Sequence, residues 1–461
     1  MGMLDARERE RRRAAAAHSL ERLAGLDVVG VALTWVDNAG LTRVKAVPVE
    51  RLEHAAVWGV GATPAFDAFL LDDSIMSGRY SGGPIGDLRL HPDLDRLTVL
   101  AGQQGWAWAP VDRFDQDGRE HPQCARALLR RTVDKLAQQD LIASAAFEIE
   151  WALGRGDAPG FSPAAGGPAY GMTRLIELSD YSRDVLTALR DEGVVVEQYH
   201  PEYGAAQFEL SVAAEDPVGA ADTSVLVRQT LRAIGQRHGL RTSFSPKVLV
   251  EGVGNGGHVH LSVRGPDGPL LTGGAGPAGL TAPGEGFVAG ILDRLPALLA
   301  LGAPSAASYL RLVPSHWAGA FACWGVENRE AAIRLISGAT GSEPTSANVE
   351  VKCVDAAANP YLLLAGLLAA GHAGIDGAST LPPALDVDPS SIPENERAER
   401  GVRPLPADLE QAATAFEGDA ELTAWFGPEL SATVADMRRA EHALTRDMSA
   451  EEIVELTRWR H

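Results

Sequence analysis

The sequence predicts an α+β protein of two domains. Its 461 residues, 45% of them hydrophobic, are enough for a large core and for more than one domain. Short strand-like segments recur as far as residue 112, and from there on strands alternate with long amphipathic helices. The polar segment RFDQDGRE at 113–120 separates the two patterns. We therefore place the domains at residues 1–116 and 117–461.

The first domain begins with a charged segment that predicts a surface helix over residues 4–25. Residues 27–48 predict a hairpin, because two apolar runs, VVGVALTWV and LTRVKAV, flank the turn segment Asp-Asn-Ala-Gly. Further strand-like pieces follow until the boundary segment.

The second domain opens with a helix in REHPQCARALLRRTVDKLAQQD, and two more helices are predicted at 180–193 and 222–239, with acidic starts and glycine ends. Strands are predicted at 144–151, 205–212, 242–250, 257–263, 331–337 and 348–354. Residues 264–286 and 379–406 are rich in glycine or proline and predict irregular surface segments. The chain from 407 onward predicts helices.

The charge balance excludes some partners. Lys and Arg number 41 and Asp and Glu 61, so the formal charge is 41 − 61 = −20, which argues against nucleic acid and an anionic membrane surface. The three cysteines have no metal-binding spacing, and the first residues lack the apolar core of a signal peptide. No apolar run has membrane-spanning length. We expect a cytoplasmic protein without a membrane or nucleic-acid partner.

The segment AAFEIEW at 145–151 places two acids on a predicted strand. Side chains two positions apart point to the same face of a strand, so Glu148 and Glu150 lie side by side between Phe147, Ile149 and Trp151. Two neighbouring anions in a partly buried place repel each other, and one of them takes up a proton unless a cation compensates them.

Three further segments bring acids and histidines into the same half of the chain. They hold Glu197, Glu202, Gln207 and Glu209 in EQYHPEYGAAQFEL, His258 and His260 in GVGNGGHVHLSV, and Glu350 in NVEVKCVD. A solvated strand face is the alternative for each acid taken alone, but four such segments favour a divalent cation. Mostly carboxylates with one imidazole suit Mg²⁺ or Mn²⁺, and six ligands need two ions. Such ions serve phosphoryl transfer.

The nucleotide site implied by this chemistry is not a P-loop, because the chain has no GxxxxGK[ST] segment. GVGNGG matches GxGxxG but leads into a strand rather than a helix, so we reject a dinucleotide-binding site. Arg311, Arg329 and Arg334 are the candidates for holding phosphate groups, with structural ion pairs as the alternative for each.

Taken in order, these motifs resemble the glutamine synthetase family, in its type I-like form, over nearly the whole chain. WVDNAGLTRVKAVP resembles its N-terminal strand pair, and FEIEW, HPEYGAAQFEL and SFSPKVLVEGVGNGGHVHLSV resemble its acidic and histidine segments. SYLRLVP, ENREAAIRL and VEVKCVDAAANPYLLLAG follow in the family's order. The resemblance implies a small β-grasp domain and a catalytic α/β domain with a curved antiparallel sheet. It also implies a homo-oligomer, in hexameric rings stacked as a dodecamer, with active sites between neighbouring subunits.

The resemblance assigns roles residue by residue. Two metal ions would be held by Glu150, Glu202 and Glu209 and by Glu148, His258 and Glu350. The ATP site would include Glu197, His260, Ser262 and Arg334. The catalytic arginines would be Arg329 and Arg334, which contact phosphate, and Arg311, which with Gly254 contacts glutamate.

The implied reaction joins glutamate to an amine with ATP. The γ-phosphoryl group of ATP passes to the side-chain carboxylate of glutamate, an amine attacks the acyl phosphate, and phosphate leaves. Metals and arginines are suited to this chemistry because they stabilise the charge of the phosphoryl group, and a guanidinium binds a carboxylate bidentately.

Trp317 is the departure from the family that bears most on the substrate. The family has a glutamate here, in a flap that shields the site and helps to deprotonate bound ammonium. An indole only donates a hydrogen bond, so it supplies neither charge nor base. Val253 and Lys352 replace a family asparagine and arginine, and Tyr170 matches a family tyrosine near the amine. We count Lys352, Trp317 and Tyr170 as substrate-binding.

We therefore expect ATP-dependent ligation of an organic primary amine, such as ethanolamine or a polyamine, to the γ-carboxylate of glutamate. The ring of Trp317 can pack the methylenes of such an amine and contact its ammonium by a cation–π interaction. Three alternatives stay open. One is an ammonia-using glutamine synthetase with a rebuilt flap, and another is a non-catalytic structural or regulatory relative. The third is a family member that uses another acid, for which Val253 and Lys352 are the reason.

Overall fold

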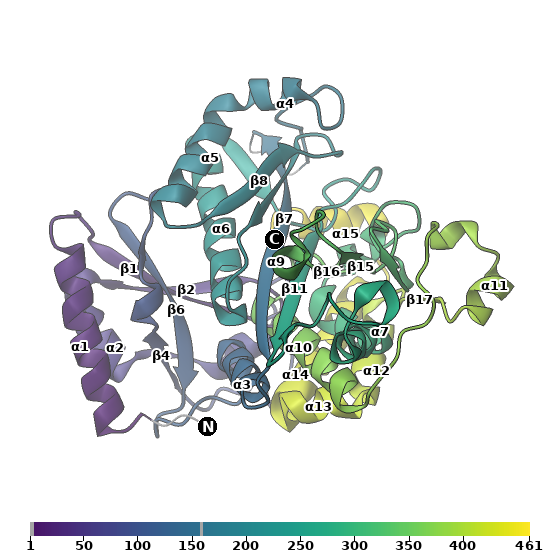
Figure 1. Ribbon diagram of the computed structural model, residues 1–461. Helices are drawn as coiled ribbons and strands as arrows, with labels where there is room; N and C mark the ends of the chain where they lie inside the picture. Colours follow the sequence, from purple (N-terminus) through teal and green to yellow (C-terminus); the bar gives the residue numbers. More distant parts are fainter. Residues whose placement is uncertain (1–3, 157–159) are drawn as a thin grey trace.

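A computed structural model describes residues 4–156 and 160–461 (Figure 1). The first part of the chain forms a six-stranded sheet of order β2-β1-β6-β4-β3, with β5 paired to β6. Its strands are β1 (Gly30–Val36), β2 (Thr42–Pro48), β3 (Val60–Ala62), β4 (Leu88–Pro92), β5 (Thr98–Val99) and β6 (Trp106–Phe114). β1 and β2 pair antiparallel, as the hairpin prediction requires.

A nine-stranded sheet follows, of order β14-β15-β16-β11-β7-β9-β8, with β10 on β7 and β12 on β11. Its strands are β7 (Ile142–Arg155), β8 (Val196–Pro201), β9 (Gln207–Val212), β10 (Leu240–Ser243), β11 (Gly257–Gly265), β12 (Gly268–Pro269), β14 (Trp324–Val326), β15 (Ile333–Ile336) and β16 (Asn348–Val351). All its pairings are antiparallel except that of β14 with β15. β13 (Phe321–Ala322) pairs with β17 (Arg403–Pro404) in a separate ribbon.

Helices cover both sheets and form the end of the chain (Figure 1). They are α1 (Ala6–Leu23), α2 (Leu52–Trp58), α3 (Ala125–Ala137), α4 (Met172–Glu177), α5 (Ser179–Asp191), α6 (Pro217–Arg237), α7 (Ala282–Gly302), α8 (Ala306–Arg311), α9 (Glu343–Ser346), α10 (Pro360–Asp376), α11 (Glu394–Glu399), α12 (Leu409–Gly418), α13 (Ala420–Phe426), α14 (Pro428–Thr445) and α15 (Ala450–Thr457). The predicted α+β fold with an antiparallel second sheet is confirmed. The domain limits and the β-grasp assignment stay predictions.

Two segments differ from the sequence-based expectation. The strand predicted at 242–250 ends at Ser243, because the Phe244 N–H donates to the His461 carbonyl at 3.1 Å and the Ser245 N–H donates to Ser243 Oγ at 3.2 Å. Pro246, which follows, has no N–H to resume the ladder. The segment predicted as a loop at 264–286 contains β12 and the start of α7. Thr281 caps that helix by accepting from the Gly284 N–H at 3.1 Å.

α10 is the apolar segment that comes nearest to a membrane span in sequence, and it is buried in the protein. It packs against α7 so closely that a Cβ at Gly374 would lie 2.1 Å from the Gly286 carbonyl oxygen. A Cβ at Gly290 would lie 2.3 Å from the Ala370 carbonyl oxygen. Within residues 4–156 and 160–461, no helix has the length and apolar character needed to cross a membrane.

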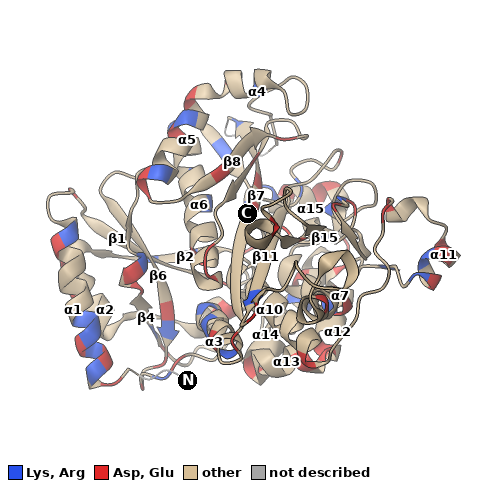
Figure 2. Ribbon diagram, viewed as in Figure 1, with Lys and Arg blue, Asp and Glu red and all other residues tan. Residues whose placement is uncertain are grey.

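The basic residues near the start of the chain lie on α1, at the outer edge of the smaller sheet (Figure 2). Glu8 pairs with Arg11 at 2.8 Å and with Arg12 at 2.9 Å, one helical turn away. Spacings of three and four residues place such partners on one face of a helix. The positive charge of the arginine run is therefore partly neutralised by an acid of the same helix.

Candidate active site

The acid pair on β7 follows from the alternation of side chains along the strand. Phe147, Ile149 and Trp151 are 5%, 1% and 0% exposed and belong to the main hydrophobic core. Glu148 and Glu150 therefore point to the opposite face. Both line a cleft of about 1140 Å³.

Strand register brings the other acids and histidines beside this pair. The aligned pairs are Glu148 with His258, Glu150 with Glu209, Glu350 with His260, Glu350 with Arg334 and Glu209 with His200. Segments as far apart as 150 and 350 in sequence thus contribute to one face of one sheet. The cleft that they border also receives Tyr170, Glu202, Gly254, Arg311, Trp317, Arg329 and Lys352.

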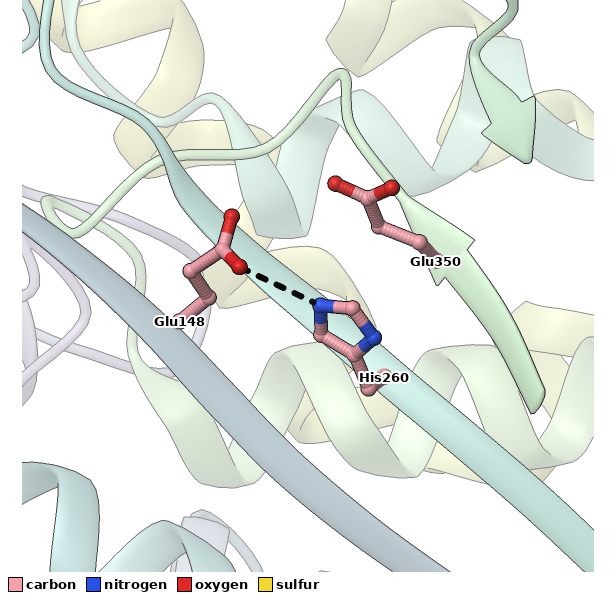
Figure 3. Close-up of side chains that lie close together, drawn as sticks. All are labelled: Glu148, His260 and Glu350. Atoms are coloured by element: carbon pink, nitrogen blue, oxygen red, sulfur yellow. Dashed lines mark ion pairs between the residues drawn. The ribbon is translucent and has the colours of Figure 1, made fainter. Parts of the chain in front are cut away.

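One cluster gathers ligand atoms of Glu148, His260 and Glu350 within 4.8 Å of one another (Figure 3). His260 Nε2 lies 3.8 Å from Glu148 Oε2. His258 joins the same group, because its Nδ1 lies 2.8 Å from Glu148 Oε1 and 3.1 Å from Glu350 Oε1. The structure thus brings together all three residues of one expected metal set and adds a second imidazole.

A second cluster consists of His200, Glu202 and Glu209. His200 Nε2 lies 3.2 Å from Glu209 Oε1, and His200 Nδ1 lies 3.7 Å from Glu202 Oε1. His200 was not among the residues expected from the sequence. The sequence contains the pattern that could have indicated it, because His200 stands two positions before Glu202 in a strand-like segment and side chains at that spacing share a strand face.

Glu150, expected in this second set, lies between the clusters and is held by neutral donors. Its Oε2 accepts from Gln207 Nε2 at 2.8 Å and from the Gly256 N–H at 2.9 Å. Its Oε1 lies 3.8 Å from His258 Nε2. These contacts fix the carboxylate while one oxygen still faces the other ligands.

The electrostatics of the clusters fit a cation. Burial raises the pKa of Glu209 to about 7, although the His200 hydrogen bond opposes this shift and the charges of Glu148 and Glu150 add to it. Burial and Lys352 lower the pKa of His258, but Glu148 and Glu350 outweigh them and raise it to about 9. Burial also opposes ionisation of Glu148 and Glu350, but the two histidines and, for Glu350, Lys352 outweigh it and lower the pKa of both carboxyls. Glu209 therefore still needs nearby positive charge, and mostly oxygen ligands with imidazole suit Mg²⁺ or Mn²⁺.

The expected glutamate-binding residues, Arg311 and Gly254, both line the cleft. Arg311 is 5% exposed and donates from Nη2 to the Lys352 carbonyl at 3.0 Å. Its Nη1 is buried and, within residues 4–156 and 160–461, has no hydrogen-bond partner. Gly254 leaves no room for a side chain, because a Cβ would lie 2.2 Å from the Pro246 carbonyl oxygen and 2.8 Å from Arg311 Cγ. Lys352 Nζ lies 2.9 Å from Glu350 Oε1.

The two remaining arginines reach the cleft from β15 and from the loop before it. Arg334 Nη1 donates to Glu350 at 3.2 Å and Nε donates to Glu327 at 3.1 Å, so its guanidinium is held beside the metal cluster. Arg329 is exposed at the cleft. Glu197 and Ser262 do not line the cleft, whereas His260 does.

Trp317 borders the cleft in a flap with a strained backbone. Ser315 and Trp317 both have positive φ, 61° and 53°, which is uncommon for residues other than glycine. The Trp317 N–H donates to Glu330 Oε1 at 3.0 Å, and Ser315 Oγ donates to Asp388 Oδ2 at 2.9 Å. The Trp317 side chain is 53% exposed. Sequence reasoning missed Glu330, which holds the flap.

Comparison with known proteins assigns the family. The family model described as "Glutamine synthetase, catalytic domain" matches residues 122–456. The chain belongs to the glutamine synthetase family. It is thus a ligase of that family, as the ordered motifs predict.

Among the relatives of this glutamine synthetase-family chain is gamma-glutamylpolyamine synthetase GlnA3 of Streptomyces coelicolor, which is 52% identical over 442 residues, 95% of each chain. Glutamate–isopropylamine ligase of a Pseudomonas species is 30% identical over 400 residues, 84% of this chain and 85% of the relative. A crystal structure described as a novel glutamine synthase homolog has a TM-score of 0.82 and 34% identity, and covers 93% of this chain and 98% of that one.

Proposed function

We propose that the protein ligates an organic primary amine to the γ-carboxylate of glutamate, with ATP as the phosphoryl donor. The observation that supports an organic amine as the substrate is Trp317, which lines the cleft where the family resemblance implies a glutamate. The names of the two curated relatives, a polyamine ligase and an isopropylamine ligase, support the same substrate class. A polyamine is the amine we favour, since the relative named for it shares 52% of the aligned residues.

The two clusters fit two divalent cations. We assign one to Glu148, His258 and Glu350, and the other to Glu150, Glu202 and Glu209, with His200 and His260 alongside. When bound, such cations neutralise charge on phosphoryl oxygens. The protein's part is to hold five carboxylates and an imidazole at one sheet face. Strand register fixes the spacing of all of them except Glu202, which directly follows β8.

Different arginines bind the two substrates, glutamate and ATP. The buried Nη1 of Arg311 is a free donor for the glutamate carboxylate, which a guanidinium binds bidentately. Arg334, anchored by Glu350 and Glu327, and Arg329 are placed for phosphoryl oxygens. His260 is placed for ATP, and Glu197 and Ser262 are assigned to ATP on the family resemblance alone.

The proposed chemistry has two steps. A glutamate carboxylate oxygen attacks the γ-phosphorus of ATP, ADP leaves, and an acyl phosphate forms. The uncharged amine nitrogen then attacks the acyl carbon, the bond from carbon to the phosphate oxygen breaks, and phosphate leaves while the nitrogen loses a proton. The ring of Trp317 contributes by packing the amine's methylenes and keeping water from the acyl phosphate.

The test is phosphate release from ATP with glutamate, measured over a panel of polyamines, ethanolamine, isopropylamine and ammonium. We expect one of the organic amines to give a higher kcat/KM than ammonium. A preference for ammonium over every amine would make the chain an ammonia-using glutamine synthetase. Absence of turnover with all of them would make it a non-catalytic relative.

A further inference from the structure

Arg174 on α4 is a buried arginine whose guanidinium links two segments that border the active-site cleft. The residue is 5% exposed. Its Nη1 donates to the Glu202 carbonyl at 2.5 Å and to the Gly204 carbonyl at 2.6 Å. Its Nη2 and Nε donate to the Gly167 carbonyl at 2.9 Å and 3.2 Å. One guanidinium thus connects the segment 202–204 with the segment that runs from Gly167 to α4.

The acceptors of this guanidinium indicate that it fixes the backbone. Within residues 4–156 and 160–461, the Arg174 side chain donates only to main-chain carbonyl oxygens, among them that of Tyr203 at 3.4 Å. A buried charge is otherwise mostly paired with an opposite charge. The planar fork of an arginine holds several acceptors at fixed relative positions, which the single ammonium group of a lysine does not do.

The two linked segments supply side chains to the cleft. Tyr170 comes from the first segment, and Glu202 and Tyr203 come from the second; all three line the cleft. The rings of Tyr170 and Tyr203 are 48% and 60% exposed. The Tyr170 ring also lies beside His200 of the second metal cluster, with 6.3 Å between the ring centroids. The position of this part of the cleft wall therefore depends on how the two segments are held together.

The direct contact between the two segments is weaker than the contact through Arg174. The Tyr170 N–H lies 3.4 Å from the Glu202 carbonyl oxygen, which is long for a hydrogen bond. Arg174 donates to the same oxygen at 2.5 Å, and its donor carries a positive charge, which strengthens the bond. Tyr170 has φ 56°, a conformation that persists in a residue other than glycine only when its surroundings hold it.

We propose that Arg174 is a positioning residue for the amine substrate, an inference that rests on the proposed function. It fixes the backbone on both sides of Tyr170 and Glu202, so that the Tyr170 ring keeps one place in the cleft wall. Arg311 and Gly254, which we assign to glutamate, are held by other contacts. Loss of the paired donors should therefore weaken amine binding and leave glutamate binding unchanged.

The first test measures hydrogen–deuterium exchange of the full chain and needs no catalytic activity. We expect a peptide spanning residues 200–206 to exchange at least five-fold faster in Arg174→Lys than in the wild type. Arg190→Lys is the matched control, since Arg190 lies on the next helix, pairs with Asp191 at 2.8 Å and does not line the cleft. Equal exchange in Arg174→Lys and the wild type would overturn the proposed link.

The second test separates the substrates by steady-state phosphate release at saturating ATP and Mg²⁺. We expect KM for the preferred amine to rise at least five-fold in both Arg174→Lys and Arg174→Gln, and KM for glutamate to stay within two-fold of the wild-type value. Tyr170→Ala, which removes the positioned ring and leaves the buried guanidinium in place, should raise the amine KM in the same way. An amine KM that stays at the wild-type value in Tyr170→Ala, or that rises together with the glutamate KM in Arg174→Lys, would refute positioning of the amine.

The two proposals fail in different measurements. A wild type that turns over no amine would refute the proposed function, and the amine role of Arg174 with it, whereas the exchange experiment would still decide whether Arg174 links the two segments. Turnover of an amine by the wild type, with unchanged KM values in the Arg174 variants, would refute the positioning role alone.

Discussion

Replacing Trp317 by glutamate should shift the amine preference toward ammonium. The indole is 53% exposed and lines the cleft, and its backbone is held by Glu330. The ring is therefore about half buried, so its contact with an organic amine contributes the binding free energy typical of an exposed site. A carboxylate at the same place would lose this apolar surface and would attract the small ammonium ion.

The size of the effect follows from that exposure. A cation–π contact at an exposed site contributes about 0.5–1 kcal/mol, and one methylene packed on the ring contributes about 0.8 kcal/mol. Together they amount to about 1.5 kcal/mol, or roughly a ten-fold change in rate ratio. We expect the ratio of kcat/KM for the preferred amine to that for ammonium to fall about ten-fold in Trp317→Glu.

The assay is steady-state phosphate release with each amine at saturating ATP and glutamate. Trp58→Glu is the matched control, because Trp58 is 51% exposed on α2 and does not line the cleft. Its ratio should equal that of the wild type. An unchanged ratio in Trp317→Glu, with turnover intact, would show that Trp317 only packs the flap and does not select the amine.

Three further predictions follow from the structure. Glu150→Ala should abolish product formation while circular dichroism stays native, and a strong chelator should silence the wild type; full activity with chelator present would refute the metal assignment. Burial raises the pKa of Glu441 from 4.5 to about 7, so its stabilising contribution is present below pH 4.5 and is lost as pH rises through 7. In urea unfolding, the free energy of unfolding of the wild type should fall by about 3 kcal/mol between pH 4.5 and 8 through this group, and Glu441→Gln should remove that fall. Parallel pH curves for the two proteins would contradict the prediction. Light scattering should give an oligomer of identical chains, and an active monomer would rule this out.

The sequence by itself determined the family, the α+β class and the pairing of acids on β7. These are properties of consecutive residues: alternation of Phe147, Ile149 and Trp151 with Glu148 and Glu150 requires only a period of two. It also indicated that the apolar segment of α10 is too short to span a membrane, whereas its burial against α7 is a finding of the structure. Where a local rule failed, as at 242–250, a contact distant in sequence ended the strand, because the Phe244 N–H donates to the His461 carbonyl.

Only the tertiary structure decided which of these residues meet. His200 joins Glu202 and Glu209 because β8 pairs with β9 in one register, and Glu330 holds Trp317 because the flap folds back onto the loop before β15. Such contacts depend on register and on packing between distant segments, and a pattern along the chain does not encode either, since a shift of one residue would turn every side chain to the other face.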